Sequence, residues 1–114
     1  MATAVLLVLT NPVAGQEKEY NEWYDNIHLR EVCALPGFTG ARRYRLASGE
    51  SPQKYLALYD IAADNPQQAL AGLTQAEMVE YLRAAGAGTF NMSPALDMKT
   101  VSMALFEQTT DYKK

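Results

Sequence analysis

Two residue types that dominate metal and redox sites are almost absent from this sequence. Its 114 residues include one cysteine, Cys33, and one histidine, His28. Without a second cysteine or a histidine at ligand spacing, Cys33 is expected to be a small buried hydrophobe rather than a nucleophile. One histidine and one cysteine do not make an ordinary zinc or iron site. We therefore expect no metal site.

Other signatures of known chemistry are also missing. No glycine-rich phosphate loop follows a strand, and no serine lies in a nucleophile elbow, so we expect no cofactor. The longest apolar run, residues 4–9, is far shorter than the roughly 20 residues that span a bilayer, and a membrane is not an expected partner. The first three residues lack the charged region of a secretory signal, which favours a cytoplasmic protein.

Charge of one sign is not concentrated along the chain. The formal net charge is −3, and the single basic cluster is Arg42, Arg43 and Arg45 on one predicted strand. Nucleic acid is therefore not an expected partner. These arginines could meet an anionic substrate, but a solvated or dimer-contacting strand face is the preferred interpretation. We therefore expect no catalytic role for the three arginines.

Hydrophobic spacing predicts six elements in the order β, α, β, β, α, β. The apolar residues Tyr20, Trp23, Tyr24 and Ile27 recur at intervals of three and four, which predicts one face of a helix from residue 16 to about 27. Residues 28–32 either continue this helix or start a new turn, and Pro36-Gly37 must end it. Alternating or continuous apolar runs predict strands over residues 4–10, 38–47, 55–61 and 98–106. A second helical region spans residues 66–84, with a capping box at Thr74-Gln75-Ala76-Glu77.

This order predicts an α+β fold of the ferredoxin-like, split βαβ kind. One domain over residues 1–108 would hold a four-stranded antiparallel sheet with both helices on one face, followed by a polar tail over residues 109–114. The strands are apolar on both alternations, as in Leu6 and Val8 against Leu7 and Leu9. A sheet that is apolar on both sides needs cover on both sides, so we expect a homodimer.

His28 is the main candidate for chemistry. If the helix reaches it, Tyr24 lies one turn before it, Asp25 lies at i−3 and Asn21 at i−7, so Asn21, Tyr24 and His28 share an edge of the apolar stripe. An imidazole with an ordinary pKa near 6.5 accepts or donates a proton at neutral pH, and a neighbouring carboxylate can orient it. The alternative is a helix-end histidine that contacts the final carbonyls and carries no chemistry.

The pattern Tyr20-x-x-Trp23-Tyr24-x-x-x-His28, with Pro36-Gly37-Phe38 and Ala41-x-Arg43-Tyr44, resembles the EthD-like branch of the dimeric α/β-barrel superfamily. The match covers roughly residues 9–46, and the later half agrees in element order and in the last strand. The resemblance implies a ferredoxin-like fold whose sheets associate into a dimeric barrel, with one cleft per subunit between sheet and helices. It also implies that His28 matches the histidine that often faces the cleft as acid or base.

Together these observations predict a cofactor-free enzyme that uses general acid and base chemistry on a hydrophobic aromatic or polyketide-like small molecule, in a lyase, cyclase or isomerase reaction. The expected catalytic residues are His28 and Tyr24, and the expected substrate contacts are Trp23, Asn21, Asp25 and Tyr44. A cofactor-free monooxygenase and a non-catalytic small-molecule-binding or stress-response dimer are the alternatives. Haem-degrading relatives usually carry their iron-ligating histidine on the later helix, which has none here, so haem is not expected.

Overall fold

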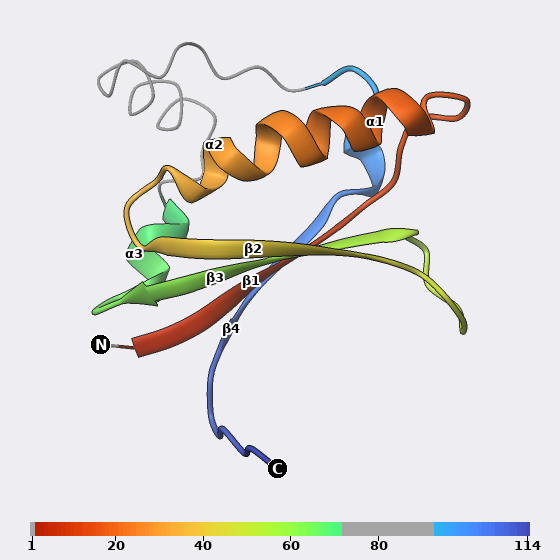
Figure 1. Ribbon diagram of the computed structural model, residues 1–114. Coiled ribbons are helices and arrows are strands. Elements are labelled where there is room, and N and C mark those ends of the chain that lie inside the picture. Colours follow the sequence, from red (N-terminus) through yellow and green to blue (C-terminus); the bar gives the residue numbers. More distant parts are fainter. Residues whose placement is uncertain (1, 72–92) are drawn as a thin grey trace.

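A four-stranded antiparallel sheet is the centre of the molecule (Figure 1). The computed structural model describes residues 2–71 and 93–114. The strands lie in the order β2-β3-β1-β4, which places the first and third strands of the sequence in the middle. Their bounds are Ala2–Thr10 for β1, Phe38–Arg45 for β2, Tyr55–Ala63 for β3 and Ser102–Glu107 for β4. This confirms the predicted ferredoxin-like α+β sheet.

One continuous helix lies across one face of the sheet (Figure 1). It consists of α1 (Glu17–Trp23), a π-helical segment (Tyr24–His28) and α2 (Leu29–Cys33). The helix therefore continues well past Ile27, and the chain turns into β2 at Gly37, where a φ of 90° favours glycine. After β3 lies the helix α3 (Pro66–Ala71), at the start of the range predicted as the second helical region. The predicted capping box at Thr74 lies outside the described residues.

The last strand differs from the prediction at its start. Residues 98–100, expected in the strand, form a short 3₁₀ turn (Met98–Thr100) instead. The Asp97 carboxylate accepts a hydrogen bond of 3.0 Å from the Lys99 backbone N–H, which stabilises this turn. The polar tail after β4 has no regular secondary structure and is exposed.

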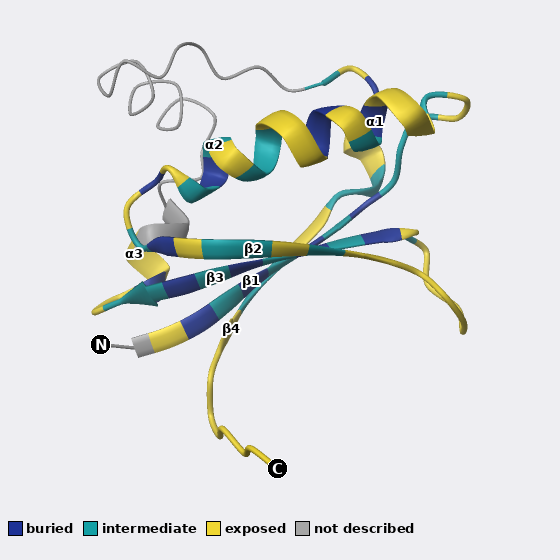
Figure 2. Cartoon of the chain, in the orientation of Figure 1, coloured by how far each residue is buried: buried dark blue, intermediate teal, exposed yellow. Residues whose placement is uncertain are grey.

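The core lies between the long helix and the facing side of the sheet, and Figure 2 shows the buried positions gathered there. It is formed from the helix by aromatic and aliphatic residues and from the strands by every second side chain. Ile27, predicted on the apolar stripe, is 49% exposed. Ile27 does not follow the apolar spacing because the helix changes from α to π winding at Tyr24, just before it. The core side chains are Ala4, Leu6, Val8, Tyr20, Trp23, Tyr24, Val32, Leu35, Phe38, Tyr55, Ala57, Tyr59, Ile61, Ala95 and Leu96.

A register shift in β2 changes which of its side chains face the helix. The pairing with β3 is irregular between Phe38 and Gly40, so the simple alternation predicted from the sequence is broken there. Phe38 is buried, and Ala41 packs against the same core. Arg43 follows Ala41 on this face, whereas Arg42 and Tyr44 point to the other side of the sheet.

The second face of the sheet has no described helix over it (Figure 1). Phe106 and Tyr44 on this face are 54% and 47% exposed. Half-buried aliphatic residues lie between them, namely Val5, Leu7, Leu9, Leu56 and Leu58. The expectation of a sheet that is apolar on both sides is therefore correct.

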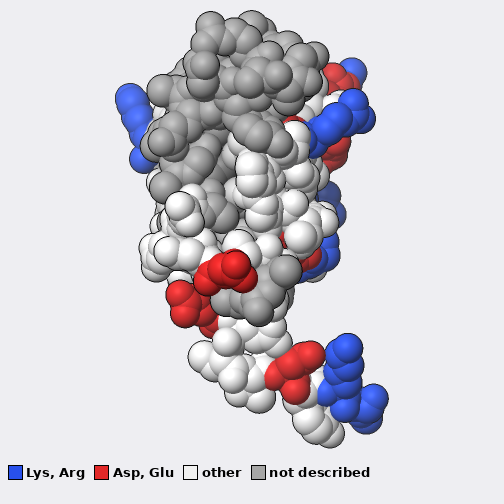
Figure 3. Space-filling model, turned by 90° about the vertical axis from the view of Figure 1, so that its left-hand side faces the viewer, with Lys and Arg blue, Asp and Glu red and all other residues white. Residues whose placement is uncertain are grey.

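Charged groups of both signs are distributed over the described surface. In the view of Figure 3 they lie mainly at the margins and on the C-terminal tail, with uncharged side chains between them. Within residues 2–71 and 93–114, no helix has the length and apolar character needed to cross a membrane.

Candidate functional site

The centre of the candidate site is a wide helical turn. Residues Tyr24–His28 wind as a π-helix, and the Leu29 backbone N–H donates to the Tyr24 carbonyl, five residues earlier. At 3.6 residues per turn, residues five apart in an α-helix point in different directions. The wider π-turn brings the side chains of residues five apart closer to the same direction, so that the His28 ring lies against the Trp23 ring. Their ring centroids are 4.5 Å apart and the planes are 19° from parallel.

Tyr24 forms the second wall around His28. Its ring is perpendicular to the imidazole, with 5.1 Å between centroids, and its side chain is buried. Burial raises the pKa of the Tyr24 phenol, with the Arg43 guanidinium acting in the opposite direction. A phenol that keeps its hydrogen at neutral pH is a hydrogen-bond donor beside an imidazole. We call Trp23, Tyr24, His28 and Glu31 the His28 cluster.

Glu31 completes this cluster from α2. Its Oε1 lies 3.7 Å from Nδ1 of His28, and the two side chains are 13% and 12% exposed. This separation is within ion-pair range but longer than a hydrogen bond. From the sequence we expect a neighbouring carboxylate that can orient His28, without assigning it to one residue, and the structure places Glu31 beside Nδ1.

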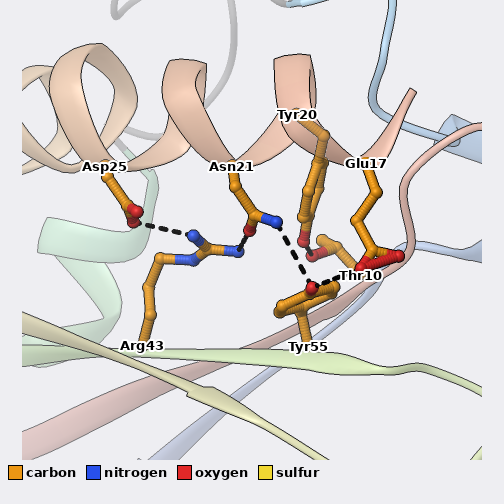
Figure 4. Close-up of polar contacts among 7 residues, drawn as sticks. All are labelled: Thr10, Glu17, Tyr20, Asn21, Asp25, Arg43 and Tyr55. Atoms are coloured by element: carbon orange, nitrogen blue, oxygen red, sulfur yellow. Dashed lines mark hydrogen bonds and ion pairs between the residues drawn. The ribbon is translucent and has the colours of Figure 1, made fainter.

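Arg43 joins β2 to the helix, where it meets Asp25 and Asn21 (Figure 4). Its guanidinium donates to Asp25 Oδ1 at 2.7 Å and to Asn21 Oδ1 at 2.9 Å. The same group lies over the Tyr24 ring, 4.3 Å from its centroid. Two charge-assisted hydrogen bonds and a cation–π contact on a side chain that is only 11% exposed make Arg43 a strong link between sheet and helix.

Further polar contacts extend from Arg43 toward the start of the helix (Figure 4). The Asn21 amide donates to the Tyr55 hydroxyl at 3.2 Å, and that hydroxyl donates to Glu17 at 3.0 Å. Thr10 and Tyr20 share a buried hydrogen bond through their hydroxyl groups. These contacts fix the angle of the helix on the sheet, and hence the position of the π-turn.

The structure brings only part of the expected site together. Trp23, Tyr24 and His28 form one cluster. Asn21 and Asp25 lie on the β2 side of the helix, bound to Arg43, which also contacts the Tyr24 ring. Tyr44 lies on the opposite face of the sheet from His28.

Sequence reasoning missed Arg43 and Glu31. The spacing of Asn21 and Asp25, four residues apart, indicates a polar helix edge that needs a partner, and this is the one signal that points to Arg43. Glu31 lies three residues after His28, and this helical spacing is the signal that could have found it. Within the described part of the chain, no group of histidine, cysteine, aspartate or glutamate has the arrangement of a metal site.

Comparison with known proteins gives matches in structure alone. No protein-family model matches the chain, and no curated protein matches it in sequence. Among solved structures, the chain is similar to the heme-degrader MhuD from Mycobacterium tuberculosis, with 24% identity, a TM-score of 0.63 and coverage of 96% of this chain and 99% of that one. An EthD family protein from Bacillus halodurans has 16% identity, a TM-score of 0.59 and coverage of 96% and 100%.

A third similar structure is a dabb family protein with a ferredoxin-like fold from Mesorhizobium loti, with 12% identity, a TM-score of 0.53 and coverage of 98% and 100%. The chain has the ferredoxin-like fold. The structures that share this fold over nearly their whole length include an EthD family protein, in agreement with the resemblance noted in the sequence.

Proposed function

We propose that this protein is an enzyme that moves protons on a hydrophobic, aromatic or polyketide-like small molecule, with His28 as the acid or base. The observation that carries the proposal is the fixed position of His28, which stacks on Trp23 and meets the edge of Tyr24 in a π-turn. π-Turns are rare and occur often at functional sites. A positioned proton-transfer group typically contributes 10²- to 10⁴-fold in rate.

Tyr24 serves in this proposal as the hydrogen-bond donor. A phenol is protonated at neutral pH, and burial raises the pKa of Tyr24 further, so Tyr24 can donate to a carbonyl or phenolic oxygen of the substrate while His28 takes or gives a proton. Trp23 supplies a flat apolar surface that also fixes the plane of the imidazole. The reaction class would be that of a lyase, cyclase or isomerase, in which proton transfer at a carbon next to a carbonyl is the common step.

Haem is a second ligand to test, because one similar structure is a heme-degrader with two hemes bound in its active site. Among the described residues, the His28 imidazole and the Cys33 thiol are not placed as axial haem ligands. The His28 ring is stacked on Trp23, and its side chain is only 12% exposed. Burial raises the pKa of the Cys33 thiol, which disfavours a thiolate ligand. We therefore propose a mechanism without haem.

We also propose that the active form is a homodimer joined through the second face of the sheet. The exposed Phe106 and Tyr44, with the half-buried aliphatic residues between them, support this arrangement. Large exposed apolar patches on soluble proteins usually mark an interaction surface. A second copy of the chain presents the same patch and is the simplest cover for it.

The test follows hydrogen exchange at carbon next to a carbonyl. Purified protein is incubated in D₂O with a panel of aryl ketones and aryl β-diketones, and loss of the α-hydrogen signal is followed by NMR. The native protein should accelerate exchange on at least one compound. His28→Gln should lower that rate by about 10² or more, whereas Glu22→Gln, an exposed position on the same helix, should not change it.

Two results would contradict the proposal. One is an exchange rate that is equal in the native protein and in a folded His28→Gln variant. The other is binding of the panel compounds, measured by Trp23 fluorescence, without any exchange or conversion, which would favour the non-catalytic binding protein. Reconstitution with hemin, followed by its absorption spectrum, tests the haem alternative on the same preparation.

A further inference from the structure

One carboxylate oxygen of Glu31, Oε1, is buried in an environment that supplies it with no hydrogen-bond donor among the described residues. A buried carboxylate oxygen without a donor is costly, and such a group in a native protein calls for an explanation, of which a catalytic role is one. Within the same residues, the basic group in ion-pair range of Glu31 is His28 Nδ1.

The other carboxylate near His28 in the sequence is committed elsewhere. Asp25 lies at 2.7 Å from the Arg43 guanidinium, and its side chain is 59% exposed. Arg43 holds Asp25 on the β2 side of the helix. Of these two carboxylates, the one beside the His28 imidazole is therefore that of Glu31. The π-turn and the start of α2 thus place one imidazole and one carboxylate against each other inside the molecule.

We propose that Glu31 is the positioning residue for His28. A neutral imidazole carries its hydrogen on one nitrogen and accepts at the other. A carboxylate facing Nδ1 favours the form with the hydrogen on Nδ1, so Nε2 becomes the nitrogen that exchanges a proton with the substrate. Trp23 and Tyr24 fix the plane of the ring, and Glu31 fixes which nitrogen carries the hydrogen. The role of Nε2 in catalysis rests on the proposed function. The position of the imidazole hydrogen on Nδ1 does not.

The imidazole form can be measured directly because the chain contains one histidine. Tag-free, ¹⁵N-labelled protein gives a single set of imidazole signals in long-range ¹H–¹⁵N spectra. At a pH where the same spectra show the imidazole to be neutral, the native protein should show Nδ1 protonated and Nε2 unprotonated. Glu31→Gln should move the signals toward the Nε2-protonated form that prevails for free histidine in water.

The matched control is Glu22→Gln, whose side chain is 62% exposed and pairs with Lys18 on the same helix. It should leave the imidazole signals unchanged. With an exchanging ketone identified, Glu31→Gln should also lower kcat by at least about tenfold, with a smaller effect on KM.

A native spectrum with Nε2 protonated overturns the positioning role, even if Glu31→Gln fails to fold. So does a folded Glu31→Gln variant whose imidazole signals match those of the native protein. If the spectra behave as expected while His28→Gln retains full exchange activity, the positioning role stands and the proposed enzyme function fails. The two ideas are therefore tested separately.

Discussion

His28 stacks on Trp23, the residue five positions before it, with 4.5 Å between ring centroids. An α-helix does not bring these two positions together, and the stack exists because residues Tyr24–His28 form a π-turn. The contact links the core to the candidate acid or base. Its loss should therefore change both stability and the environment of the imidazole.

Replacing Trp23 tests this link. Trp23→Ala should lower the free energy of unfolding by about 3–5 kcal/mol, because a large buried aromatic side chain is removed. Trp23→Phe should cost less and keep a ring-current shift on the His28 carbon-bound hydrogens. Ile27→Ala, at an exposed position, is the control and should change little. Equal losses at both positions, measured by urea unfolding, would contradict the described packing.

Arg43 should be far more important to stability than its neighbour Arg42. Arg43→Met removes two charge-assisted hydrogen bonds and the contact with the Tyr24 ring, and should cost about 2–4 kcal/mol. Arg43→Lys should recover part of this, because lysine keeps the charge but not the planar fork. In the single chain the Arg42–Asp60 pair is partly exposed, at 47% and 36%, so Arg42→Gln should have a much smaller effect on the unfolding of the monomer. Chemical denaturation of the three variants checks the order.

Two buried tyrosines should respond oppositely to loss of the hydroxyl. Tyr20→Phe leaves the buried Thr10 hydroxyl without its partner and should cost about 1–3 kcal/mol. The Tyr59 hydroxyl is buried and makes no hydrogen bond to any described residue. Tyr59→Phe should therefore be neutral or stabilise the protein by up to about 1 kcal/mol. A larger loss at Tyr59 than at Tyr20 in thermal unfolding would reverse this interpretation.

Stability should fall in alkaline solution. Burial raises the pKa of Tyr20, Tyr24 and Tyr59 above the ordinary phenol value of about 10. The unfolded chain then loses these protons at lower pH than the native protein, so their stabilising effect is complete below about pH 10 and is lost as the pH rises through the folded values. Tyr59→Phe should make the fall of stability less steep, whereas Tyr112→Phe, at an exposed position, should not.

The proposed dimer can be tested on a single strand. Phe106→Glu places a charge on the second face of the sheet and should convert a dimer to a monomer by light scattering. Met103→Glu lies on the opposite face of the same strand, is also exposed, and should leave the dimer intact. A native protein that is monomeric at micromolar concentration, or a dimer that survives Phe106→Glu, would contradict the proposal.

The sequence alone determined the order of elements and the composition of the core. Apolar spacing of two and of three to four is a local property of the chain, so it predicted all four strands of the sheet and the buried positions of Tyr20, Trp23 and Tyr24. Pro36-Gly37 likewise fixed the end of the first helix. The continuous apolar run of β1 also predicted that both faces of the sheet are apolar, because neighbouring residues of a strand point to opposite faces.

The tertiary structure decided the site. The π-turn and the β2 register shift each alter the side-chain period by one residue, and neither has a local sequence signal that spacing could reveal. The first moved Ile27 out of the core and placed His28 on Trp23. The second brought Arg43 to the helix side of the sheet, where it binds Asp25 and leaves Glu31 as the carboxylate beside His28. The Arg43 contacts join β2 to the helix, so the packing of the helix on the sheet determines them. Trp23, His28 and Glu31 lie on one continuous helix, and the winding of that helix brings them together.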